Sequence, residues 1–352
     1  MTSINALKIT ANSGVMVCDE QRGWNDDRLK IYCSDKILPL LSPELSKRYK
    51  LAVAYGNTGS STIGDEIRQT LKRAITQQYE KQVALLGHPP ETFLNLEDLA
   101  RLTFQVICDI KRDHIDESLK HSYGFTTQDL IRGQYEKKGE MVSLETQEVI
   151  EEALKRIGPS GDPAKHNVLN NAGILAGYDA SNGFQIFMFS MREYYYEPIY
   201  SNFACLGSGS DTANFVMANF FNQRSLQERA QGLDSARALR QLLTAVATAS
   251  QTNIGVGGYM NIIIFNGPTS QSSGELIEVN DHRSKLVLEA VLALGEHFFA
   301  EEAVQDLIKG LLFEQKDLAW GEELFWGKAK HPQNLHRFLR GYPEEFWKQK
   351  KL

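Results

Sequence analysis

The chain has 352 residues, of which 42% are hydrophobic and 23% charged, so we expect a globular protein with a sizeable core. Its net charge of −6 at pH 7 argues against a nucleic-acid-binding protein that depends on phosphate contacts. There is no signal-peptide pattern, no membrane-length apolar run and no CxxC spacing. We therefore expect a reduced, cytoplasmic protein with neither nucleic acid nor membrane as a partner.

The first 60 residues predict short strands. Turn-forming residues separate β-prone runs at residues 6–10, 14–19 and 51–55. Residues 29–33 and 36–41 are expected to form a further pair of strands. A turn-rich stretch after the last run marks the change from strands to helices.

Two helices are predicted next. Apolar side chains recur every four residues from Ile63 to Tyr79, as one face of a helix requires, and two consecutive prolines end this run. Asn95 is expected to cap a second helix, whose apolar face continues to Ile110. Residues 114–167 are rich in charge and are interpreted as a polar, partly helical insertion.

The rest of the chain alternates again between strands and helices. Strands are predicted at residues 172–178, 185–191, 202–206 and 259–265, with helices at 211–222 and 225–250. The order of strands, two helices, strands, two helices and a strand is typical of two sheets covered by helix pairs on both outer faces. We therefore predict an α+β fold over residues 2–267, with a helical C-terminal extension at 284–352.

Thr2 is the residue with the clearest chemical potential. Met1 before a small residue is commonly removed, and Thr2 would then carry both a hydroxyl nucleophile and a free α-amine that can act as its base. The amine has an ordinary pKa of about 7.7–8.0, close to the optimum for a base at neutral pH. No HExxH, GxSxG or GxxxxGK[ST] motif occurs, and we expect neither a metal nor a cofactor.

Six segments of the chain resemble, in order, the β-type subunits of proteasomes, which belong to the N-terminal nucleophile hydrolases. They are residues 14–19 (GVMVCD), 35–40 (DKILPL), 51–56 (LAVAYG), 174–179 (ILAGYD), 205–211 (CLGSGSD) and 249–258. The resemblance covers roughly residues 2–267 outside the insertion. It implies a four-layer αββα sandwich.

The resemblance also implies roles for individual residues. Thr2 would be the nucleophile, Asp19 and Lys36 the charged pair beside it, and Gly56 the donor of a backbone N–H to the oxyanion. Ser208 would help to hold the terminal amine. A cation near that amine would lower its pKa and keep a free base available.

Two positions depart from the family. Asn253 stands where the family has an aspartate in the group that supports the threonine, and Val256 stands where it has a second serine. The spacings from Thr2 to Asp19 and from Asp19 to Lys36 are each one residue longer than usual. Three functions stay open: a threonine amidohydrolase acting on peptide bonds, a non-catalytic homologue used for assembly or binding, and a transpeptidase.

The resemblance implies a peptide or protein substrate and a homo-oligomer. The aromatic C-terminal extension would add apolar surface that a monomer rarely leaves exposed. Truncation near Gly274 is therefore expected to change the oligomeric state or the solubility while the sandwich survives.

Overall fold

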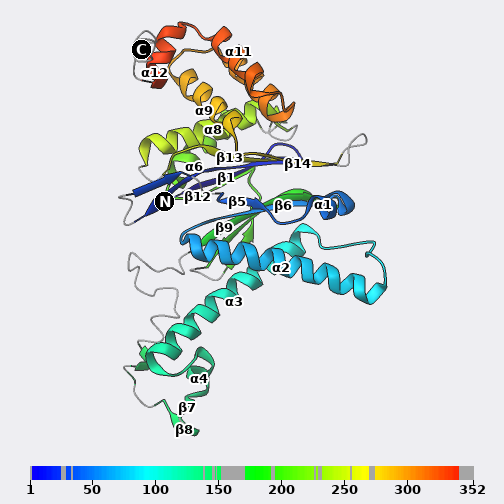
Figure 1. Ribbon diagram of the computed structural model, residues 1–352, viewed down its shortest axis with the longest axis vertical. Helices are drawn as coiled ribbons and strands as arrows, with labels where there is room; N and C mark the ends of the chain where they lie inside the picture. The colour runs from blue at the N-terminus through cyan, green and yellow to red at the C-terminus, as the bar shows by residue number, and fades with distance from the viewer. Residues whose placement is uncertain are drawn as a thin grey trace, which may run out of the picture. The chain divides into compact units, whose positions relative to one another are not determined.

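The structure is a computed structural model that divides the chain into two compact units. Unit 1 comprises Met1–Thr58, Ile174–Ile186 and Pro198–Leu352, and unit 2 comprises Gly59–Gly173 and Phe187–Glu197. The residues described are 2–24, 29–32, 35–137, 139–144, 147, 149–151, 171–191, 195–225, 227–228, 232–253, 256–268 and 274–340. The fold is mixed α+β with antiparallel sheets, as the order of elements in the sequence predicts (Figure 1).

The first sheet lies in unit 1 and has the strand order β12-β1-β2-β13-β14. Its strands are β12 (Phe203–Gly207), β1 (Ser3–Lys8), β2 (Ser13–Asp19), β13 (Met260–Asn266) and β14 (Glu275–Val279). All four neighbouring pairs are antiparallel. Strand β1, which begins immediately after Thr2, therefore lies inside the sheet rather than at its edge.

The second sheet has the order β11-β10-β9-β6-β5. Its strands are β11 (Tyr195–Pro198), β10 (Gly183–Ser190), β9 (Ala172–Asp179), β6 (Ala52–Thr58) and β5 (Ile37–Pro39). In unit 1 it faces the first sheet, because the rings of Phe184 on β10 and Phe265 on β13 lie 5.5 Å apart between centroids. Gly14 on β2 leaves room for the Phe184 ring, which a Cβ at that position would meet.

Two predicted strands have other partners than expected. Strand β4 (Leu29–Tyr32) pairs with β3 (Gln21–Trp24), and β5 pairs with β6, so residues 29–33 and 36–41 do not form a pair with each other. Pro39 lacks a backbone N–H, and β5 lies at the edge of its sheet, where that loss is tolerated. Strand β14 was not predicted from the sequence.

The described helices of unit 1 come from both halves of the sequence. They are α1 (Pro43–Tyr49), α6 (Ser210–Asn222), α8 (Ser235–Thr252), α9 (His282–Gly295), α10 (Glu301–Ile308), the π-helix η1 (Lys309–Phe313), α11 (Leu318–Lys328) and α12 (Pro332–Arg340). The helix predicted at residues 225–250 is interrupted: residues 227–228 are helical, residues 232–234 are not, and α8 begins at Ser235. Gly232 has a φ of 85°, and the Asp234 side chain accepts from the Arg237 N–H as the N-cap of α8.

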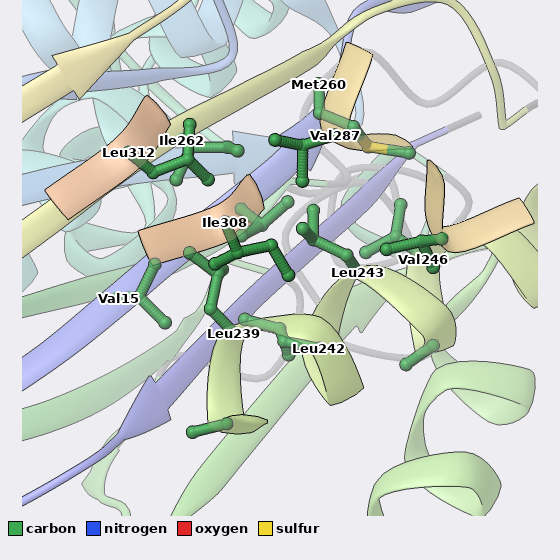
Figure 2. Close-up of a cluster of buried hydrophobic side chains, with 14 of the residues drawn as sticks. Val15, Leu239, Leu242, Leu243, Val246, Met260, Ile262, Val287, Ile308 and Leu312 are labelled. Atoms are coloured by element: carbon green, nitrogen blue, oxygen red, sulfur yellow. The ribbon is translucent and has the colours of Figure 1, made fainter. Parts of the chain in front are cut away.

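The core of unit 1 lies between the first sheet and the helices on its outer face (Figure 2). Val15 and Ile262 of the sheet, Leu239 of α8, Val287 of α9 and Ile308 of α10 are all buried in one cluster. The helices at the C-terminal end of the sequence are thus part of the main core of unit 1. Trp347, one of the tryptophans of the aromatic C-terminal extension, falls outside the described residues.

Unit 2 is built on two long helices, α2 (Ser61–Leu86) and α3 (Leu96–Tyr123). The predicted face of α2 is buried from Ile63 to Ile75, and Asn95 caps α3 with a capping box, as expected. Helix α3 continues to Tyr123, so the first ten residues of the predicted insertion belong to this helix. The short elements α4 (Thr127–Arg132), β7 (Gln134–Lys137) and β8 (Glu140–Ser143) follow it.

Helix α3 contacts Met191, directly after β10, and Tyr196 on β11, which belong to the same unit. Lys111 is buried and its Nζ donates to the carbonyl oxygen of Met191 at 2.5 Å. Burial lowers the pKa of Lys111 to about 8. The ring of Phe104 lies 5.0 Å from that of Tyr196 on β11. Among the helices described, none has the length and apolar character needed to cross a membrane.

Candidate active site around Thr2

A buried ion pair joins the end of β2 to the residue before β5. Lys36 Nζ lies 2.9 Å from Asp19 Oδ1 and also donates to the Gln21 carbonyl oxygen at 2.5 Å. Asp19 has no exposed surface and Lys36 is 4% exposed. Charges so deeply buried are tolerated only when they are paired and hydrogen-bonded. The pair predicted from the sequence is therefore formed, with both partners held in place.

Two backbone N–H groups complete the hydrogen bonding of the Asp19 carboxylate. Ser3 N donates to Oδ1 at 2.8 Å, and Gly257 N donates to Oδ2 at 3.1 Å. Ser3 directly follows Thr2, and Lys36 bonds the same carboxylate oxygen as Ser3. The ion pair consequently adjoins the start of the chain, although its two members are 17 residues apart.

Ser208 contacts the backbone of Thr2 from the turn that follows β12. Thr2 N lies 3.1 Å from Ser208 Oγ, which in turn lies 3.4 Å from the carbonyl oxygen of Thr2. Gly209 N also donates to that carbonyl at 3.4 Å. With Met1 attached, the Thr2 nitrogen is an amide, and removal of Met1 would turn it into an amine at the same place. Thr2 itself is only 7% exposed.

Asn253 and Val256, the two departures from the proteasome-like pattern, both reach this turn. Asn253, at the C-cap of α8, donates from Nδ2 to the Ser208 carbonyl oxygen at 2.8 Å. Val256 is buried, and its Cγ2 would lie 3.0 Å from a Cβ placed on Gly209. Asn253 thus supports the turn by a neutral hydrogen bond, and Val256 supports it by apolar packing.

Gly56 lies on β6, where it pairs with Ile37 of β5. A Cβ at this position would lie 2.6 Å from Ile37 Cγ2, 3.2 Å from the Lys36 carbonyl oxygen and 3.3 Å from Ile4 Cγ2. Close packing against the two neighbouring strands is therefore one reason for glycine here. The predicted donation of its N–H to an oxyanion stays a prediction.

Gly207 is required by the backbone of the same turn. Its φ is 102°, and a Cβ would lie 2.1 Å from the carbonyl oxygen of Thr2. We expect Gly207→Ala to reduce the free energy of unfolding by about 1–3 kcal/mol or more, because strain and a backbone clash add together. Gly295→Ala is the control, since a Cβ on Gly295 meets nothing within 4 Å. Urea denaturation of both variants tests this, and equal stabilities would contradict it.

The structure also adds residues that sequence reasoning missed. The carbonyl of Gln21 and the N–H groups of Ser3 and Gly257 hold the ion pair through backbone atoms, for which side-chain identity gives no signal. Beside the pair, burial raises the pKa of the Glu20 carboxyl, and the neighbouring Asp35 carboxylate raises it further.

The cysteines near this region are poor alternative nucleophiles. Burial raises the pKa of the Cys18 thiol to about 12, and it does the same for Cys205. Thiols with such a pKa stay protonated at neutral pH. Cys33 lies outside the described residues. Within the part of the chain that is described, no three His, Cys, Asp or Glu side chains gather as a metal site would need.

The arrangement as a whole is a hydroxyl-bearing Thr2 whose nitrogen meets a serine hydroxyl, next to a buried carboxylate–ammonium pair. Such a set can activate a nucleophile and can stabilise charge close to it. No protein-family model matches the chain, and no curated protein matches its sequence.

Proposed function

We propose that the protein is an N-terminal threonine amidohydrolase of the peptidase class, which acts in the cytoplasm on a peptide or protein through a threonine acyl-enzyme. One observation carries the proposal. The Thr2 nitrogen lies 3.1 Å from Ser208 Oγ, while the next N–H, that of Ser3, bonds the carboxylate that pairs with Lys36.

In the proposed reaction, Thr2 Oγ1 attacks the carbonyl carbon of the substrate amide and passes its proton to the free Thr2 amine. The tetrahedral intermediate collapses when the C–N bond breaks, and the leaving nitrogen takes the proton from the amine. An ester between Thr2 and the acyl part remains. A water molecule, deprotonated by the same amine, then attacks the ester and releases the acid and free Thr2.

The surrounding groups have supporting roles in this scheme. The Lys36 ammonium disfavours protonation of a nearby amine, and Asp19 keeps Lys36 charged and oriented. Ser208 Oγ would accept a hydrogen bond from the Thr2 amine, so that the lone pair of the amine faces the Thr2 hydroxyl. The Gly56 N–H is assigned to the oxyanion, where one such donor is worth about 2.7–4 kcal/mol of barrier.

The fold assigned to this activity is the four-layer αββα sandwich. Unit 1 contributes the first sheet, the part of the second sheet that faces it, and the helices on the outer face of the first sheet. Within unit 2, the contacts of Lys111 with Met191 and of Phe104 with Tyr196 join α3 to residues at and beside β10 and β11, as the packing of a helix on a sheet requires. A homo-oligomer is part of the same proposal.

A non-catalytic homologue is the second candidate, and Asn253 and Val256 are the observations that favour it. Asn253 cannot supply the negative charge found in the family, and Val256 cannot supply the hydroxyl. They support the turn by a neutral hydrogen bond and by apolar packing instead. Transpeptidation uses the same acyl-enzyme with an amine in place of water. A product analysis with an added amine nucleophile would separate it from hydrolysis.

Labelling of Thr2 tests the proposal directly. Intact mass first establishes that Met1 is absent, and a peptide epoxyketone or β-lactone should then add one adduct, located on Thr2. Thr2→Ala should abolish the adduct and any peptidase activity, whereas Thr2→Ser keeps a hydroxyl and should still be labelled. Thr76→Ala, on an exposed side of α2, is the control.

Two outcomes would count against the assignment. An adduct that persists in Thr2→Ala would place the reactive group elsewhere. A folded, Met-free protein that is never labelled would favour the non-catalytic homologue.

A further inference from the structure

The loop between α8 and β13 contacts both parts of the candidate site. Asn253, at its start, bonds the carbonyl oxygen of Ser208 on the side of the Thr2 nitrogen. Gly257, further along, bonds Asp19 on the side of the ion pair. One short segment thus fixes the turn that meets Thr2 and the carboxylate that meets Lys36.

Both backbone polar groups of Gly257 are hydrogen-bonded to the site. Its N–H donates to Asp19 Oδ2 at 3.1 Å, and its carbonyl oxygen accepts from Gln21 N at 3.0 Å. The carbonyl oxygen of Gln21 in turn accepts from Lys36 Nζ at 2.5 Å. These contacts link Gly257, Gln21, Lys36 and Asp19 into a closed ring of hydrogen bonds around the ion pair.

The two oxygens of the Asp19 carboxylate accept from different donors. Oδ1 receives both the Ser3 N–H and the Lys36 ammonium, while Oδ2 receives the Gly257 N–H. Without a donor on Oδ2, the plane of the carboxylate could turn partly about its Cβ–Cγ bond, and Oδ1 would then leave its place opposite Lys36 Nζ. A buried carboxylate with three fixed donors has one orientation, and Lys36 Nζ then has one position.

Resting on the proposed threonine chemistry, we propose that Gly257 is a positioning residue, whose backbone N–H orients Asp19, the carboxylate that holds Lys36 and accepts the N–H of Ser3 next to Thr2. Glycine suits this position because a Cβ would lie 2.7 Å from Gln21 Oε1. That atom is the end of a flexible side chain, so an alanine can be accommodated by a small shift. The N–H, rather than the lack of a side chain, is the group on which the role depends.

The test compares Gly257→Pro, which removes the N–H, with Gly257→Ala, which keeps it. Inactivation of the full-length, Met-free protein by a β-lactone is followed at several concentrations, to separate kinact from KI. Loss of a hydrogen bond to a charged group should lower kinact by about 10- to 100-fold in the proline variant, with KI unchanged. The kinact of the alanine variant should stay within about threefold of that of wild type, because the Gln21 side chain can shift to make room for the added methyl group.

Three results would overturn this role. They are a proline variant inactivated at the wild-type rate, an alanine variant impaired as strongly as the proline variant, and a change confined to KI. A wild-type protein that forms no adduct overturns the threonine chemistry as well, which distinguishes the two failures.

Amide hydrogen exchange gives a second measurement, which holds even if the proline variant does not fold. In Asp19→Asn, whose side chain has the same shape but no charge, the Gly257 N–H should exchange about tenfold faster than in wild type. Circular dichroism establishes that this variant is folded. An unchanged exchange rate in a folded Asp19→Asn protein would show that the carboxylate does not hold Gly257, and the proposed role would fall.

Discussion

Replacing Lys36 with alanine is expected to reduce the rate of Thr2 labelling by at least about 100-fold, because the cation beside the proposed base is lost. It should also lower the free energy of unfolding by about 3–5 kcal/mol, since Asp19 would be left as a buried charge without its partner. The side chain of Asp19 has no exposed surface, so water cannot replace the ammonium without a rearrangement. Inactivation kinetics and urea denaturation measure the two effects separately.

Two further variants sharpen this prediction. Lys36→Arg keeps the charge but replaces a compact ammonium by a planar guanidinium, so we expect a folded protein with impaired labelling. Lys309→Ala removes a lysine whose side chain is 67% exposed and whose partner Glu314 lies 3.8 Å away, so it should change stability by less than about 1 kcal/mol. A fully active Lys36→Ala protein would remove Lys36 from the site and weaken every other assignment there.

Ending the chain after Gly274 is expected to abolish folding. The truncation removes β14 and the helices α9 to α12, which line the same core as β2 and α8. Val287, Ile308 and Leu311 are completely buried in that core, and each buried aliphatic side chain contributes about 1.5–3 kcal/mol. Their joint loss exceeds the usual net stability of about 5–15 kcal/mol once the other buried side chains are included.

This expectation is the reverse of the one drawn from the sequence alone, in which the sandwich survives truncation near Gly274. The aromatic and apolar residues of the tail suggest a surface for a partner, and in the structure they pack against the chain itself. Ending the chain after Arg340 is the matched control, because it removes only residues beyond the described core. Circular dichroism and thermal denaturation check both proteins, and a cooperative transition in the protein that ends at Gly274 would contradict the prediction.

Periodic apolar patterns explain which parts of the fold could be predicted. The spacing of four residues from Ile63 onwards identifies the buried face of α2, and Asn95 marks the start of α3. The sequence predicts one helix over residues 225–250, whereas residues 232–234 are not helical and α8 begins at Ser235. The apolar pattern does not indicate the interruption of the helix at Gly232, which has a positive φ, and Asp234, which caps α8.

The site shows a different division. Hydrogen bonds link Thr2 to Ser208, Ser208 to Asn253, and Asp19 to Lys36 and to the Ser3 N–H beside Thr2. The groups that hold them are backbone atoms, and their positions depend on how distant strands pair rather than on side-chain identity. For the same reason, the sequence could not show which surface the C-terminal helices cover, since an apolar helix face packs equally well on its own chain or on a partner.

The position of β1 inside the first sheet sets an order of events during synthesis. Thr2 meets Ser208 across 206 residues of sequence, and β1 gains its neighbour β12 only when that later segment has been made. At about 5–20 residues per second, a ribosome needs roughly 10–40 seconds to make this stretch. On the proposed threonine chemistry, Met1 would be removed most readily during that interval, because only 7% of Thr2 is exposed once the sheet has formed. The speed of translation would then help to set the fraction of the protein that carries a free Thr2 amine.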